Sequence, residues 1–126
     1  MRVLLDANFL MIPGQFGVDI FTELERVLQG KHELITLDSV VQELKGLSKG
    51  RTKDARAASM ALQLIEKKGV RVLHEEGQAD EAIVTAAIKG NAIVATQDRT
   101  LQDALHKRGV ALVTLKGKNR LELEGT

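Results

Sequence analysis

The pattern that decides the fold is clearest in residues 90–108, which read GNAIVATQDRTLQDALHKR. Gly90 suits the end of one helix, Asn91–Ala95 has the length and apolar content of a buried strand, and Arg99–Arg108 has helical periodicity. The same order of glycine, strand and helix recurs along the chain. This alternation is typical of an α/β protein with a parallel sheet.

Five strands and five helices follow from this pattern. We predict strands at Arg2–Asp6, His32–Leu37, Val70–Leu73, Asn91–Ala95 and Val110–Leu115. We predict helices at Val18–Gln29, Ser39–Leu47, Lys53–Lys68, Ala79–Lys89 and Arg99–Arg108. Pro13-Gly14 indicates a loop. Residues 1–126 are expected to form one domain with a core at 2–115 and a polar tail at 116–126, in which the alternating Leu121 and Leu123 leave a further edge strand open.

Composition narrows the class of protein. The chain has 126 residues, 44% hydrophobic and 28% charged, as expected of one soluble globular domain. No apolar run approaches the ~20 residues that span a bilayer, so no membrane partner is expected. Cysteine is absent, which excludes disulfides and thiolate metal sites. The chain passes from Met1-Arg2 directly into a strand, which argues against a cleaved signal peptide and makes the cytoplasm the expected location.

Four acidic residues stand beside apolar segments, where an unpaired carboxylate is costly. Each lies at the end of a predicted strand or on the buried side of a predicted helix: Asp6, Glu43, Asp80 and Asp98. The carboxyl ends of strands are where ligands bind in doubly wound sheets, so Asp6 and Asp98 would face each other if their strands were neighbours. We therefore expect a site for a hard cation that acts on phosphate.

Each acid also has a structural interpretation. Asp98 could cap the helix that follows it, and Asp80 could satisfy a helix dipole. Glu43 could pair with Lys49 or Arg56. Among the remaining acids, Glu23 and Glu25 are expected on a solvated helix face, and Asp103 is expected to be exposed.

The residues near these acids indicate oxygen chemistry. Asn8 and Thr96 are placed to donate hydrogen bonds that orient Asp6 and Asp98, although turn formation explains them as well. His32, His74 and His106 are scattered, and no GxSxG, Walker or GxGxxG motif occurs. Without cysteine or clustered histidine, Mg²⁺ or Mn²⁺ is a better match than zinc.

The charge distribution indicates a phosphate-bearing partner. The net charge is +1, but five cations lie within twelve residues: Lys45, Lys49, Arg51, Lys53 and Arg56. Such a segment binds nucleic acid or is simply a solvated helix end. The chain has three phenylalanines and no tyrosine or tryptophan, so a broad platform for stacking bases is not expected. A nucleic acid would be held by its backbone.

Four strings place these residues in a family pattern. They are Leu4-Leu5-Asp6-Ala7-Asn8-Phe9-Leu10, Val40-Val41-Gln42-Glu43-Leu44, Ala79-Asp80-Glu81 and Val94-Ala95-Thr96-Gln97-Asp98-Arg99-Thr100-Leu101. Their order and spacing resemble the PIN-domain nucleases over residues 2–115. The first and last strings are most similar to the PIN proteins related to the small-subunit ribosomal RNA processing nuclease and its archaeal relatives.

The resemblance implies a PIN-like three-layer α/β/α fold with a five-stranded parallel sheet in the order 3-2-1-4-5. It also implies a metal-dependent endoribonuclease in which Asp6, Glu43, Asp80 and Asp98 bind the metal. From the charge distribution, we expect the RNA to be bound by Lys45, Lys49, Arg51, Lys53 and Arg56. The expected role is ribosomal RNA processing. The alternatives are the toxin of a VapC-type toxin–antitoxin pair and a non-catalytic RNA-binding or assembly module.

The resemblance also raises the question of partners. The chain lacks the zinc-binding extension of some ribosome-processing members, so a ribosome-assembly partner, or an antitoxin in the alternative role, is expected. Self-association is common among PIN domains. Ala57, Ala58, Met60 and Ala61 offer a contact surface for a homodimer, and ordinary core packing explains them equally well.

Overall fold

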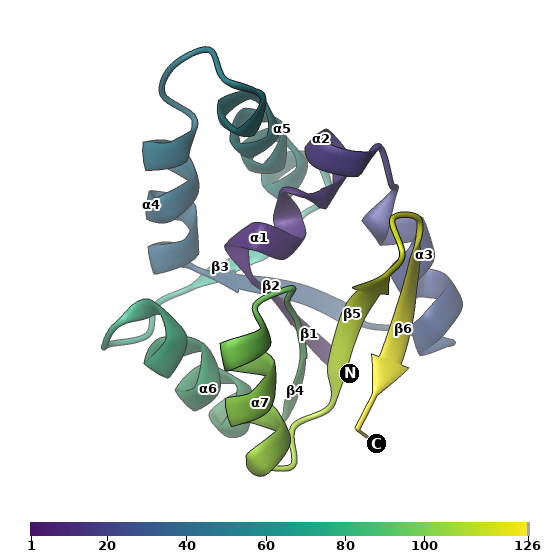
Figure 1. Ribbon diagram of the computed structural model, residues 1–126. Coiled ribbons are helices and arrows are strands. Elements are labelled where there is room, and N and C mark those ends of the chain that lie inside the picture. Colours follow the sequence, from purple (N-terminus) through teal and green to yellow (C-terminus); the bar gives the residue numbers. More distant parts are fainter. Residues whose placement is uncertain (126) are drawn as a thin grey trace.

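A mixed sheet of six strands forms the centre of the computed structural model, which describes residues 1–125 (Figure 1). The strands are β1 (Arg2–Leu5), β2 (Glu33–Leu37), β3 (Arg71–Leu73), β4 (Ala92–Ala95), β5 (Leu112–Lys116) and β6 (Arg120–Glu124). The helices are α1 (Ala7–Leu10), α2 (Ile12–Phe16), α3 (Ile20–Leu28), α4 (Asp38–Leu47), α5 (Lys53–Lys67), α6 (Ala79–Gly90) and α7 (Arg99–Lys107).

The strand order is β3-β2-β1-β4-β5-β6, and the first five strands are parallel. The predicted order 3-2-1-4-5 and the three-layer α/β/α arrangement are therefore confirmed. β1 pairs with β4 in the register Leu5↔Ala95, which brings the carboxyl ends of these two strands together. The chain leaves β1 toward β2 and β3 on one side and continues from β4 to β5 on the other. This reversal creates the crevice in which ligands of such sheets bind.

The sixth strand extends the sheet beyond the predicted core. β6 runs antiparallel to β5, and its Leu121 is fully buried. The alternation of Leu121 and Leu123 thus marks a real edge strand, and the core continues past the predicted limit at residue 115. Thr126, the last residue of the predicted tail, lies outside the described residues.

One predicted loop is a helix. Pro13-Gly14 lies inside α2, because proline is tolerated in the first helical turn, where its missing N–H is not needed. Gly14 is required by packing: a Cβ atom added there would lie 2.5 Å from the Cα of Ala57 on α5. Ala57, Ala58 and Ala61 are buried within the chain, so they belong to the core rather than to a contact between copies.

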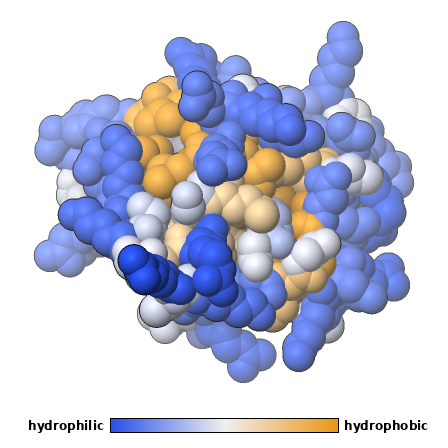
Figure 2. All heavy atoms as spheres, turned by 90° about the horizontal axis from the view of Figure 1, so that it is seen from above, coloured by the Kyte–Doolittle hydropathy of each residue, from blue (hydrophilic) through white to orange (hydrophobic). Residues whose placement is uncertain are grey.

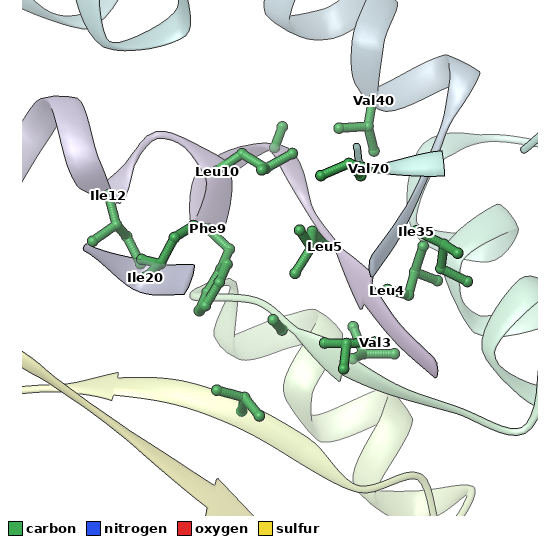
Figure 3. Packing of buried hydrophobic residues seen from close by; sticks show 14 of the residues in the cluster. Val3, Leu4, Leu5, Phe9, Leu10, Ile12, Ile20, Ile35, Val40 and Val70 are labelled. Carbon is green, nitrogen blue, oxygen red and sulfur yellow. The ribbon is translucent and has the colours of Figure 1, made fainter. Parts of the chain in front are cut away.

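The core surrounds β1. Val3, Leu4 and Leu5 are fully buried, and Phe9 and Ile35 pack beside them (Figure 3). This packing fixes the carboxyl end of β1, so the residue that follows Leu5 has little freedom to move. Within the described residues, the helices are all too short or too polar to cross a bilayer.

Candidate functional site

Asp6 is the most deeply placed acid of the chain. It follows β1 directly, its side chain is only 8% exposed, and its backbone N–H donates to the Ala95 carbonyl at 3.1 Å. One carboxylate oxygen accepts the Ala7 N–H at 2.7 Å, and the other accepts the Thr96 hydroxyl at 2.8 Å. Asp6 has hydrogen-bond donors but forms no ion pair with any of residues 1–125.

Thr96 joins Asp6 to Asp98. Its hydroxyl donates to Asp6 Oδ2 and accepts the Asp98 N–H at 3.1 Å. The side-chain oxygen of Asn8 accepts the Gln97 N–H at 3.0 Å and lies 3.4 Å from the Thr96 hydroxyl. Thr96 therefore contacts both acids, whereas Asn8, expected as a donor to an acid, instead accepts a hydrogen bond from the backbone at Gln97.

Asp98 also caps a helix, as its structural interpretation requires. Its Oδ1 accepts the Leu101 N–H at 3.2 Å at the start of α7. The side chain is half-buried. A cap and a ligand role are compatible, because a carboxylate has two oxygens with several lone pairs.

Glu43 and Asp80 complete the group from α4 and α6, and both are exposed. Burial raises the pKa of Asp6, and the charges of Asp80 and Asp98 raise it further. Partial burial likewise raises the pKa of Glu43, with contributions from Asp6 and Asp80. The four acids, here called the acidic site, therefore share one electrostatic environment. Within the described chain, Glu43 forms neither of the ion pairs considered with Lys49 and Arg56.

The acidic site has the donors that a hard cation needs, but its side chains are not closed around one. Among residues 1–125, no three Asp, Glu or His side chains lie close enough together to hold a metal ion. The donor set is all oxygen, and mutual repulsion makes the group favour a positive charge. The residues fit Mg²⁺ or Mn²⁺ chemically, provided that the exposed side chains of Glu43 and Asp80 turn toward Asp6.

Two glutamines that hold the segment 96–98 were missed by sequence reasoning. Gln97 Oε1 accepts the Leu115 N–H at 2.7 Å, which continues the contact with β5 where the backbone of β4 turns away. Gln102 Nε2 donates to the Thr96 carbonyl at 2.8 Å from α7. Gln97 lies inside the string that carries Asp98, which is a weak signal for its role. Gln102 has no signal in the sequence, because its partner is a backbone atom.

The five predicted RNA-binding cations lie together on one projection. Lys45 is on α4, Lys49 and Arg51 are in the loop, and Lys53 and Arg56 are on α5. All five are exposed, and none forms an ion pair with a residue in the range 1–125. The loop between α4 and α5 projects at the top of Figure 1. Figure 2 shows the molecule from above, so that the top of Figure 1 faces the reader, and hydrophilic side chains there surround a hydrophobic patch. We call these five cations the basic segment.

Comparisons with known proteins agree with this architecture. A family model described as a PIN like domain matches residues 3–118. The chain is 30% identical to Ribonuclease VapC4 of Methanocaldococcus jannaschii, over 98% of this chain and 97% of that protein. It is also 30% identical to Ribonuclease VapC9 of Archaeoglobus fulgidus, over 95% of this chain and 87% of that protein.

A solved structure shares the fold over nearly the whole chain. The PIN domain endonuclease Utp24 superposes with a TM-score of 0.82 at 24% identity, over 99% of this chain and 92% of that one.

Proposed function

Since the chain belongs to the PIN-like domain family, we propose that it is a divalent-metal-dependent endoribonuclease that hydrolyses RNA phosphodiesters at the acidic site. The observation that carries the proposal is Asp6. It is a nearly buried carboxylate at the reversal of strand order, coupled to other acids and without a cationic partner among the described residues. Two relatives at 30% identity carry the name ribonuclease, which supports RNA as the substrate.

The chemistry proposed for the site depends on its carboxylates. Asp6, Glu43, Asp80 and Asp98 would hold Mg²⁺ or Mn²⁺, which when bound lowers the pKa of a water and polarises the phosphoryl oxygen. The protein need not supply a side-chain nucleophile. Its own task is to keep the acids in place and to bind the substrate's phosphates.

Named residues perform those two tasks in the proposal. Thr96 holds Asp6 and Asp98 at a fixed separation, and Asn8 fixes the intervening backbone at Gln97. The basic segment binds phosphates of the RNA, because its exposed cations form no ion pair within the described chain that would compete with a ligand.

The direct test is the double variant Asp6→Asn with Asp98→Asn, assayed on single-stranded and structured RNA with Mg²⁺ or Mn²⁺. We expect cleavage to fall at least ~10³-fold, because residues that act as one unit lose most of the activity together. The matched control is Asp103→Asn, which removes an exposed acid of α7 outside the site. A folded double variant that cuts as fast as the parent would show that the acidic site is not the catalyst.

The biological role has two candidates. Processing of ribosomal RNA is the role we propose first, with an assembly partner. The toxin of a VapC-type pair is the second, and the names of the two archaeal relatives favour it. A neighbouring gene for a small antitoxin, together with growth arrest on expression that this neighbour reverses, would decide for the second role.

A further inference from the structure

A groove lies between α6 and α7 and has a volume of about 570 Å³. Asp80, one of the four acids, lines it together with the neighbouring acid Glu81, and Lys107 and Arg108 line it at the far end of α7. The groove therefore borders the acidic site at Asp80.

The groove has an apolar lining. Val84 of α6 and Leu101 and Ala104 of α7 form part of its surface, and Leu101 is only 1% exposed. Such a surface favours the flat, weakly hydrated faces of nucleotide bases or apolar side chains. It contains no aromatic side chain, so it cannot provide strong stacking on a particular base.

Two exposed cations favour nucleotides over apolar protein side chains as the occupant of the groove. Lys107 and Arg108 form no ion pair with any residue in the described chain. A basic residue in the last turn also suits the negative end of the helix dipole, but that effect does not explain why the groove leads to it. Free cations at one end and a phosphate-cleaving site at the other match a chain that carries a phosphate at every step.

We propose that the α6–α7 groove binds single-stranded RNA next to the phosphodiester that is cut. This inference rests on the proposed function and adds the path of the substrate. From Leu101 to Arg108, α7 rises about 10 Å, which corresponds to roughly three stacked nucleotides. A groove of this volume holds a short stretch of one strand and not a duplex.

The path has a second anchor on the other side of the acids. The basic segment projects from α4 and α5 at the top of Figure 1, whereas α6 and α7 lie at the bottom. The RNA would thus be held on both sides of the bond that breaks. The weak stacking in the groove predicts binding with little preference for sequence on that side.

The test uses the metal-free parent chain, so that binding is measured without cleavage. A fluorescein-labelled oligouridine of about twelve nucleotides is titrated at several salt concentrations, with anisotropy as the readout. Lys107→Gln with Arg108→Gln removes the cations, and Ala104→Leu narrows the groove without adding an aromatic ring. Lys31→Gln with Lys67→Gln is the control. These exposed lysines precede β2 and β3 and do not line the groove.

We expect the charge variant to bind about tenfold more weakly and to reduce the logarithmic salt slope by about 1.4, because each of the two lost contacts contributes about 0.7 for a single strand. Ala104→Leu should weaken binding at an almost unchanged slope, because it removes no charge. With metal present, both variants should raise KM and leave kcat at saturating RNA unchanged. The control should match the parent throughout.

The outcomes separate this proposal from the nuclease proposal. If the parent cuts no RNA but the groove variants still weaken binding, the nuclease proposal fails and the groove remains an RNA site. If the parent cuts RNA and both variants bind like the parent, the groove proposal is wrong. It is equally wrong if the parent fails to bind the oligouridine, or if Ala104→Leu blocks a protein partner while RNA binding is unaffected.

Discussion

Two carboxylates, one beside the edge strand β6 and one after the central strand β1, show opposite uses of the same group. Glu23 on α3 receives two hydrogen bonds from Arg26, at 2.8 and 3.0 Å, and a third from the Leu121 N–H at 2.9 Å. These contacts, led by Arg26, lower the pKa of Glu23 to about 2. Asp6 is more deeply buried and has acidic neighbours instead of a cation, so its pKa is raised.

The difference separates a structural acid from one that is ready for a ligand. Glu23 and Arg26 clamp both backbone groups of Leu121 and so attach the edge strand β6 to α3. The charge of Glu23 is compensated inside the chain, whereas that of Asp6 is not. An uncompensated buried charge disfavours the folded state unless something binds to it. We therefore expect the two acids to respond in opposite ways when they are neutralised.

Loss of the Glu23 charge should give the larger effect on stability. Glu23→Gln weakens a bidentate pair and a charge-assisted bond to β6, so we expect the free energy of unfolding to fall by about 1–2 kcal/mol and Tm by roughly 5 °C. The lowered pKa means that this contribution is present above the ordinary value of 4.5 and disappears as the pH falls toward about 2.

The measurement is thermal unfolding of parent and variant at pH 7 and at pH 3, with Glu25→Gln as control. Glu25 is an exposed acid of the same helix. Cleavage should be unaffected, because α3 and β6 lie away from the acidic site. Equal Tm values for Glu23→Gln and Glu25→Gln would mean that the clamp does not stabilise the fold.

Loss of the Asp6 charge should change the free energy of unfolding in the opposite direction. In EDTA at pH 7, we expect Asp6→Asn to raise the free energy of unfolding by up to about 1 kcal/mol, within the ordinary range for one substitution. A raised pKa makes the folded parent more stable at low pH, and this stability is lost as the pH rises through that pKa. The advantage of the variant should therefore vanish in acid.

Added Mn²⁺ sharpens this measurement. It should raise Tm of the parent by binding the folded state, and it should do so much less for Asp6→Asn. A variant that is less stable than the parent in EDTA at pH 7 would contradict the interpretation of Asp6 as an uncompensated charge.

These two acids also show what the sequence could predict. The position of Asp6 could be inferred, because an acid that ends a buried strand has few structural uses. The position of β4 beside β1 followed only from the family resemblance, because Asp98 by itself left it open. Glu23 and Glu25 were expected on a solvated helix face; Glu25 is exposed there, whereas Glu23 is half-buried against β6. Its partner Leu121 lies far along the chain on a strand that the sequence marked only by two alternating leucines.

The other features that the sequence did not predict were missed for a similar reason. The helix α2 was missed because proline and glycine together suggest a loop, and only the packing of Gly14 against Ala57 explains the helix. Gln102 was missed because its partner is the Thr96 carbonyl. Local signals therefore gave the strands, helices and acids, whereas contacts between distant segments decided how these parts are held.

His74 provides the intermediate case and the smallest expected effect, because it is paired like Glu23 but exposed. Its Nδ1 lies 2.6 Å from Asp38 and its Nε2 lies 2.9 Å from Glu76, and these two acids, Asp38 first, raise the pKa of His74 to about 9. The contribution to stability is complete below the ordinary value of 6.5 and is lost as the pH rises through about 9. Solvent screens such a pair, so we expect almost no change in Tm for His74→Gln. NMR titration of the imidazole should still give a midpoint above the ordinary value of 6.5, and Asp38→Asn should lower it more than Glu76→Gln does. A midpoint at the ordinary value in the parent would show that the two acids do not hold the ring.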